Sequence, residues 1–211
     1  MFIGEFVKVV SKATGVAEAT VALFARVLRE AGLLTTGARG VNAPHMKAID
    51  AARLLIAMMV TEKPSRAAEA VRDFGTLRCF EAEVIDSGSG FTLEAARQVA
   101  PDHTFEEAIA ALIDIYAHDA DETYFKDARP KFGGSIEWSP YCNVKVKLFQ
   151  LSASISMNGT QYAYVDPVLE DGDAHFAKAD KYKTNIRIEK DVMADVIDEI
   201  AFGFSKPAGE D

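Results

Sequence analysis

The sequence predicts an α+β protein: an N-terminal helix-turn-helix head, then a helical segment, and then a small antiparallel sheet with a closing C-terminal helix. Three observations support this order. Apolar residues recur at helical spacing from Phe6 to Met59, and they alternate with polar residues from Val144 onward. The pair Asn158-Gly159 favours a two-residue turn between antiparallel strands, so the alternating region is expected to form a hairpin.

Glycine and proline divide the N-terminal region into separate helices. Gly15 and the stretch from Gly32 to Gly40 interrupt the helical pattern, and Pro64 follows the third helix. The expected helices span residues 5–13, 17–30, 46–60 and 66–74, and a strand is expected at 78–85. The run Ser87-Gly88-Ser89-Gly90 is typical of a flexible joint. It predicts a helix-turn-helix DNA-binding domain at 1–86 and an α+β oligomerisation or interaction domain at 91–205.

The second region is expected to begin with two helices and to end with one. Thr92 can cap a helix that runs to about residue 100, and Thr104 forms a capping box with Glu107 at the start of the next. After the hairpin, a third strand is expected at Asn185–Ile188. An apolar stripe then predicts a final helix at Lys190–Phe202.

The charge distribution separates the head from the rest of the chain. The 211 residues have a net charge of −9, but residues 1–72 carry ten Lys and Arg against six acidic residues, which gives +4 and leaves −13 for the remainder. A basic head on an acidic body is typical of a DNA-binding unit joined to an interaction unit. No apolar run is long enough to cross a bilayer, and the start of the chain lacks a signal-peptide pattern. We therefore expect a cytoplasmic protein without membrane contact.

The segment from Val9 to Leu34 has the spacing of a helix-turn-helix motif. Ser11 is small enough for a close contact between helices, and Gly15, four positions later, can take the positive φ that the turn needs. The positions expected to face the shared core are Val10, Val16, Val21 and Phe24. The opposite side of helix 17–30 is then on the surface, where its N-terminal half could enter a major groove of DNA.

The surface residues of this helix fall into two chemical groups. Glu18 and Thr20 could hydrogen-bond to base edges, and Ala19 and Ala22 could touch thymine methyl groups. Phosphate contacts are expected from the basic residues Lys12, Arg26 and Arg29.

The glycine-rich segment from Leu34 to His45 is a candidate wing. Its flexible backbone would let Arg39 approach a phosphate or a narrow minor groove, with Asn42 and Lys47 nearby. The residues predicted to contact DNA are Lys12, Ala17, Glu18, Ala19, Thr20, Leu23, Arg26, Arg29, Arg39, Asn42, His45 and Lys47. An ordinary three-helix core produces the same pattern, so a purely structural head is the alternative.

Three stretches, TGVAEATVALFARVLREAGLL, GARGVNAPHM and IDAARLLIAMM, resemble the N-terminal DNA-binding head of helix-turn-helix proteins of phages and prophages, including small terminase subunits. The resemblance covers residues from about 5 to 62. It implies that the head binds duplex DNA while the following helices and sheet assemble an oligomer. The acidic C-terminal part departs from this pattern, so regulation of transcription and DNA packaging both stay open.

Two polar clusters and the two cysteines are expected to have structural roles and not to bind metals or catalyse a reaction. His118–Glu122 is expected to be a solvated acidic helix end, and Asp171–His175 lacks the ligand positions of a calcium loop and is expected to be a polar turn. Cys79 and Cys142 are expected to be buried, reduced thiols. The sequence contains no motif for a nucleophile, a phosphate-binding loop or a metal site, so we expect no enzyme activity, no catalytic residue, no cofactor and no metal.

Three functional hypotheses follow. The first is a sequence-specific, double-stranded DNA-binding protein of a phage or prophage that regulates transcription. It is expected to be a dimer or larger homo-oligomer, because a single head with few basic residues binds weakly. The second is a DNA-packaging subunit whose C-terminal part builds a ring. The third is a non-enzymatic adaptor whose acidic body binds a basic partner and whose head only packs.

Overall fold

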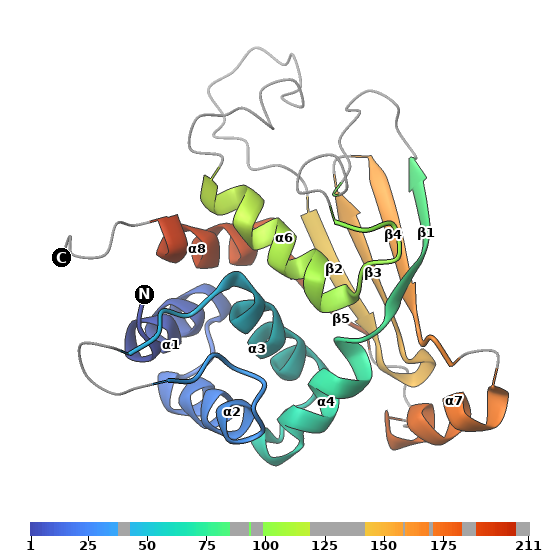
Figure 1. Cartoon of the computed structure of the whole chain (residues 1–211), viewed down its shortest axis with the longest axis horizontal. Helices are drawn as coiled ribbons and strands as arrows, with labels where there is room; N and C mark the ends of the chain where they lie inside the picture. The colour runs from blue at the N-terminus through green and yellow to red at the C-terminus, as the bar shows by residue number, and fades with distance from the viewer. Residues whose placement is uncertain are drawn as a thin grey trace, which may run out of the picture.

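The computed structural model describes residues 1–37, 43–84, 93, 99–118, 142–157, 159–168, 171–182 and 189–205. These residues form a set of helices and a five-stranded antiparallel sheet, followed by a C-terminal helix (Figure 1). This arrangement confirms the predicted α+β class.

The N-terminal helices lie within a few residues of their predicted positions. They are α1 (Ile3–Thr14), α2 (Glu18–Glu30), α3 (Ala48–Val60), the short 3-10 helix η2 (Pro64–Arg66) and α4 (Ala67–Phe74). Gly15 ends α1 with a φ of +68° and Gly32 follows α2 with a φ of +72°, a conformation that glycine adopts without steric strain. The Leu33 N–H then donates to the Leu28 carbonyl at 2.9 Å, which satisfies one of the last carbonyls of α2.

The sheet has the strand order β1-β4-β3-β2-β5, and every neighbouring pair is antiparallel. The strands are β1 (Arg78–Val84), β2 (Cys142–Lys147), β3 (Ser152–Met157), β4 (Thr160–Val165) and β5 (Glu189–Met193). Met157 pairs with Thr160 across the β3–β4 turn, where Gly159 has a φ of +85°. The predicted hairpin is therefore confirmed, although Asn158 itself lies outside the described residues.

The C-terminal elements differ from the prediction. The final helix, α8 (Ala194–Ser205), begins four residues later than predicted, because Glu189–Met193 forms strand β5 and pairs with β2. The apolar residues of this segment recur at helical spacing, but residues 189–193 are extended because they pair with β2. The strand expected at Asn185–Ile188, the joint at 87–90 and most of the helix after Thr92 lie outside the described residues.

The polar turn predicted at Asp171–His175 is wrong. Helix α7 (Gly172–Ala179) begins there, and the Asp171 side chain caps it by accepting the Ala174 N–H at 3.2 Å. The following 3-10 helix, η5 (Asp180–Tyr182), is docked onto α4, because the Tyr182 hydroxyl donates to Asp73 at 2.9 Å and the Tyr182 ring packs on Phe74. These contacts join segments about a hundred residues apart, and no local pattern predicts them.

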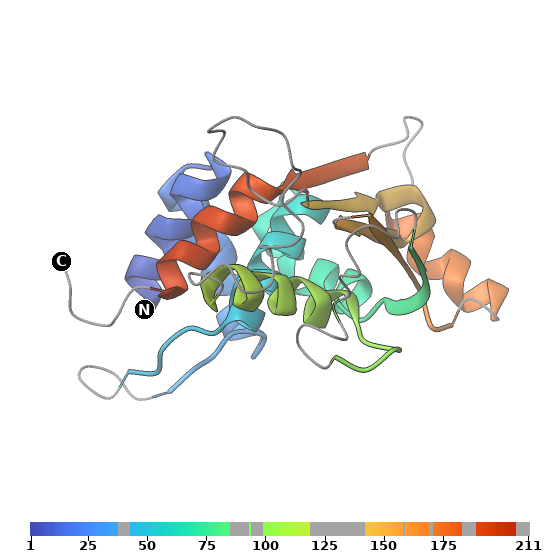
Figure 2. The same cartoon turned by 90° about the horizontal axis from the view of Figure 1, so that it is seen from above.

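One hydrophobic core joins the N-terminal helices to the sheet. Its centre is α6 (Phe105–His118), which lies beside α3 and α8 and meets the sheet at its first turn, where Phe105 packs on Tyr164 (Figures 1 and 2). The predicted capping box starts this helix: the Thr104 N–H donates to Glu107 at 2.7 Å, and the Glu107 N–H donates to the Thr104 hydroxyl at 3.3 Å. Residues of both predicted domains belong to this core, and the division at residues 87–90 stays a prediction.

An ion pair fixes α3 against α6. The Arg53 guanidinium donates two hydrogen bonds to the Glu106 carboxylate, at 3.0 and 2.9 Å, and a third to the Leu33 carbonyl at 3.0 Å. The hydrogen bond to Glu106 is the main cause that raises the pKa of Arg53. Gly75 lies against the same carboxylate, and a Cβ there would lie 2.8 Å from a Glu106 oxygen and 2.6 Å from the Val71 carbonyl. The close approach therefore requires glycine.

We expect Arg53→Met to lower the free energy of unfolding by about 2 kcal/mol. The Arg53 and Glu106 side chains are only 26% and 16% exposed, so the loss should fall between the value of about 1 kcal/mol for an exposed pair and about 3–5 kcal/mol for a buried one. Urea denaturation measures it. The matched control is Arg78→Met in the exposed Arg78–Asp102 pair, which should have little effect. Equal losses in both variants would contradict this role of the α3–α6 pair.

Candidate nucleic-acid interface

The turn between α1 and α2 is held by short side chains. The Ser11 hydroxyl donates to the Val16 carbonyl at 2.7 Å, and the Thr14 hydroxyl donates to the Val10 carbonyl at 2.7 Å. A Cβ at Gly15 would meet no atom within 4 Å, so glycine is favoured there by its positive φ and not by lack of space. The structure thus gives Ser11 and Gly15 the places that the sequence pattern predicts.

Helix α2 has one buried face and one exposed face. Val21, Phe24, Ala25 and Leu28 are buried against the rest of the head. The exposed residues of α2 and its N-cap are Ala17, Glu18, Ala19, Ala22, Leu23, Arg26, Arg29 and Glu30. Thr20 is partly buried at the edge of this surface. We call this set of exposed residues the α2 face.

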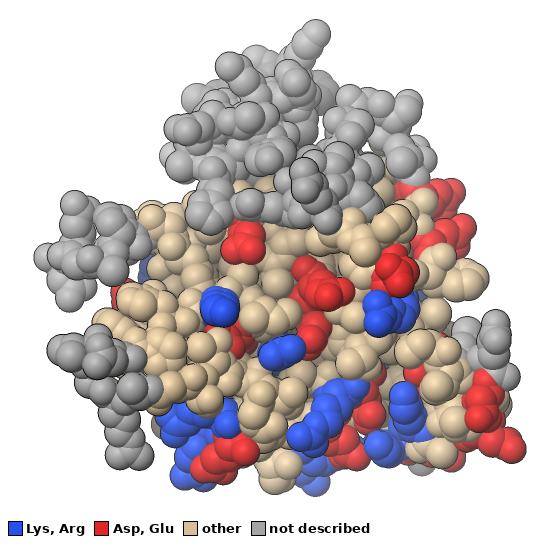
Figure 3. All heavy atoms as spheres, viewed as in Figure 1, with Lys and Arg blue, Asp and Glu red and all other residues tan. Residues whose placement is uncertain are grey.

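The α2 face carries two positive and two negative charges. Arg26 lies 3.7 Å from Glu30, and both side chains are more than half exposed, so this pair contributes little stability. Arg29 has no ion pair with any described residue. Figure 3 shows basic and acidic side chains interspersed along the lower edge of the molecule, where α2 and α4 lie in Figure 1. The face is therefore not strongly basic.

The candidate wing is anchored at its base by one buried carboxylate. The two oxygens of Asp50 accept the N–H groups of Thr35 and Lys47, each at 2.7 Å, and Asp50 is only 1% exposed. A Cβ at Gly37 would lie 3.0 Å from the Pro44 ring, so the two ends of the segment lie side by side. Residues 38–42, which include Arg39 and Asn42, lie outside the described part of the chain.

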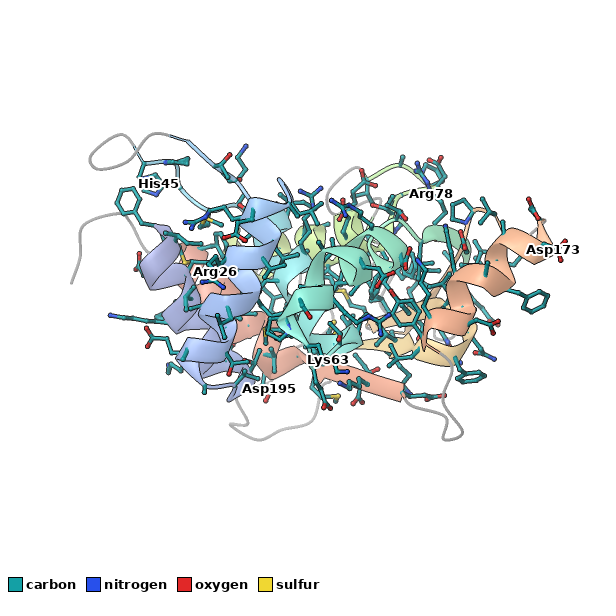
Figure 4. The ribbon with its side chains drawn as sticks, turned by 90° about the horizontal axis from the view of Figure 1, so that it is seen from below. Arg26, His45, Lys63, Arg78, Asp173 and Asp195 are labelled. Carbon is teal, nitrogen blue, oxygen red and sulfur yellow. The ribbon has the colours of Figure 1, made fainter. Side chains whose placement is uncertain are left out.

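The C-terminal end of the wing packs against the N-terminus of the chain. The Met1 amino group lies 3.1 Å from His45 Nδ1, the Phe2 and His45 rings lie 4.5 Å apart, and the Met46 N–H donates to the Met1 carbonyl. His45 and Lys47 are both exposed. Figure 4 shows His45 beside the start of α1, at the same end of the molecule as Arg26.

The predicted contact residues are therefore only partly brought together. Arg26 and Arg29 share the α2 face, and His45 and Lys47 lie at the base of the wing. Lys12 instead forms an ion pair with Glu199 on α8, so its charge is partly neutralised there.

Sequence reasoning missed Lys63. It is exposed and precedes η2, which packs against α2, and Figure 4 shows it on the same side of the molecule as Arg26. Its separation from α2 in the sequence gives no signal of this proximity, because the fold alone brings η2 to that helix.

The described residues contain no metal site, and neither cysteine is placed as a nucleophile. Cys142 is buried as predicted, and desolvation raises the pKa of its thiol to about 12. The prediction of a buried thiol is wrong for Cys79, which is partly exposed. No group of three His, Cys, Asp or Glu side chains in the described ranges could hold a metal ion, and residues 119–122 lie outside those ranges. No described helix has both the length and the apolar character needed to cross a bilayer.

Comparisons with protein-family models, with curated proteins and with solved structures found no match for this chain.

We expect Asp50→Ala to loosen the base of the wing. The substitution leaves two backbone N–H groups without their charged acceptor and should lower the free energy of unfolding by about 2 kcal/mol. Hydrogen exchange at the Thr35 and Lys47 amides should accelerate more than at amides in α6. The control Asp173→Ala, at an exposed site in the first turn of α7, should change neither amide. Unchanged exchange in Asp50→Ala would contradict the anchoring role.

Proposed function

We propose that this chain is a sequence-specific double-stranded DNA-binding protein that places α2 in a major groove. The observation that carries the proposal is the α2 face. It is open along the whole helix, its side chains are mostly small or basic, and it follows a tight glycine turn. A helix of 13 residues is about 20 Å long, and a major groove of about 12 Å width admits it.

The two halves of α2 suit different contacts. Glu18 and Thr20, in the N-terminal half, offer hydrogen-bonding groups for base edges, and Ala19 leaves room for a thymine methyl group. Arg26 and Arg29, in the C-terminal half, are placed for phosphates, with Lys47 at the base of the wing and Lys63 on the flank as additional cations. The wing residue Arg39 is proposed from the sequence alone.

The charges of the α2 face predict weak binding by a single head. The two arginines are offset by Glu18 and Glu30, so few counterions are released when one copy binds. Two heads in one homo-oligomer would raise the affinity without new contacts and would define the spacing between half-sites. We therefore propose a phage or prophage transcription regulator that acts as an oligomer. A ring of many subunits in native mass spectrometry would favour DNA packaging instead.

We expect gel-shift affinity for duplex DNA to fall with salt, with a log–log slope near −3. Phosphate contacts from Arg26, Arg29 and Lys47 would each contribute about −0.9 to it. Replacing both Arg26 and Arg29 with alanine should lower the affinity about tenfold or more and reduce the slope by about 2. The control Arg78→Ala changes an arginine at the opposite end of the molecule (Figure 4) and should leave binding unchanged. If no duplex is retained at micromolar protein, the adaptor hypothesis is favoured.

We expect Thr20→Ala and Arg39→Ala to affect DNA binding in different ways. Loss of a base contact at Thr20 should change the preference among sequences by about 1–3 kcal/mol at one base pair. Loss of a phosphate contact at Arg39 should lower the affinity for all DNA sequences by the same factor. Selection of bound fragments from random duplex DNA, followed by sequencing, measures both. The same selected sequences for Thr20→Ala and wild type would argue against α2 as the recognition helix.

A further inference from the structure

A groove lies between α1 and α2 at the surface. Its volume is about 360 Å³, which is in the lower part of the range of roughly 300–1,000 Å³ for small-molecule sites. Ile3 and Val7 of α1 and Ala22 and Ala25 of α2 give it an apolar lining. Figure 4 shows the two helices side by side, with Arg26 on α2.

Gly4 leaves the groove open. It also lines the groove, and a Cβ at this position would meet no atom within 4 Å. Neither a positive φ nor a close backbone contact requires glycine here. Glycine in a helix is less stable than alanine by roughly 0.5–1 kcal/mol, so the clearest consequence of Gly4 is the free space above it.

The charges at the rim of the groove are unequally distributed. Arg26 and Arg29 lie toward one end, and Glu18 is separated from Arg29 by about 16 Å along the axis of α2. Arg29 has no ion pair with any described residue, and the Arg26–Glu30 pair is exposed and weak. The groove therefore has an apolar floor and a cationic end, which complement a ligand with an apolar body and an anionic head.

We propose that this groove binds a small organic anion with an apolar tail, of the class of medium-chain carboxylates, with its carboxylate at Arg26 and Arg29. Guanidinium groups bind carboxylates strongly because they offer two parallel N–H donors. The same arginines are the phosphate contacts of the proposed function, so bound ligand would compete with DNA. Only this competition depends on the proposed function.

Methyl NMR of the full chain tests the binding with octanoate as the probe. Octanoate should shift the methyl signals of Ile3 and Val7 at millimolar concentration or below. Octanol keeps the tail without the charge, and butyrate keeps the charge with a shorter tail, so each should bind roughly tenfold more weakly. Absence of octanoate-dependent shifts at Ile3 and Val7, or equal affinity for octanol, would overturn the proposal.

Two substitutions locate the ligand. Gly4→Leu places a side chain in the open space and should weaken octanoate binding at least about tenfold without lowering Tm, because it meets no neighbouring atom within 4 Å at Cβ. Arg29→Gln should weaken it by a similar factor, and the distant control Arg78→Gln should not. Unchanged octanoate binding by Gly4→Leu would place the ligand elsewhere and overturn the assignment.

A duplex-retention assay separates the two proposals. Octanoate should release duplex DNA from the wild type but not from Gly4→Leu. If the wild type retains no duplex, the proposed function fails while the methyl shifts still decide whether the groove binds the anion. If octanoate shifts Ile3 and Val7 but leaves the duplex bound, the competition is refuted and the binding site stands.

Discussion

The burial of α6 is the constraint on which the rest of the fold depends. Leu112, Ile113 and Ile115 are fully buried, although their positions point to different sides of the helix. A helix that is apolar around most of its circumference must be covered on most sides. Helices α3 and α8 cover much of it, and at its first turn Phe105 packs on Tyr164 of β4, so the N-terminal helices and the C-terminal strands are parts of one core. The Arg53–Glu106 pair then fixes the position of α3 on α6.

This core leaves α2 at the periphery. The helix is held by Val21, Phe24 and Leu28 on one side, and its other side contacts no described element strongly enough to be buried. The base of the wing is anchored to α3 through Asp50. The α2 face and the α1–α2 groove are formed by residues of helices. Binding surfaces on such elements are well positioned, since little order is lost when a ligand binds.

The elements that could be predicted are those with strong local signals. Gly15 marks the first turn because few other residues adopt its positive φ, and Thr104 with Glu107 forms a capping box from residues three apart. The boundary of α8 could not be predicted, because residues 189–193 pair with β2, which is more than 40 residues away. Helix α7 was missed although its Asp171 cap is a local signal, since its sequence is short and polar. The 3-10 helix η5 that follows it is docked by Tyr182 onto Asp73, a contact between distant segments.

The sequence by itself determined most of the exposed residues of α2, because a helical period with buried Val21, Phe24 and Leu28 leaves the opposite side in solvent. Thr20 is the exception, since it is partly buried. It also determined the glycine turn and the hairpin, whose conformations depend on adjacent residues. Only the tertiary structure decided the neighbours of that face: Lys12 paired with Glu199, Lys63 brought to its flank, and a groove opened beside Gly4. These neighbours depend on how α1, α8 and η2 pack, and packing between distant segments is set by the shape of the whole core.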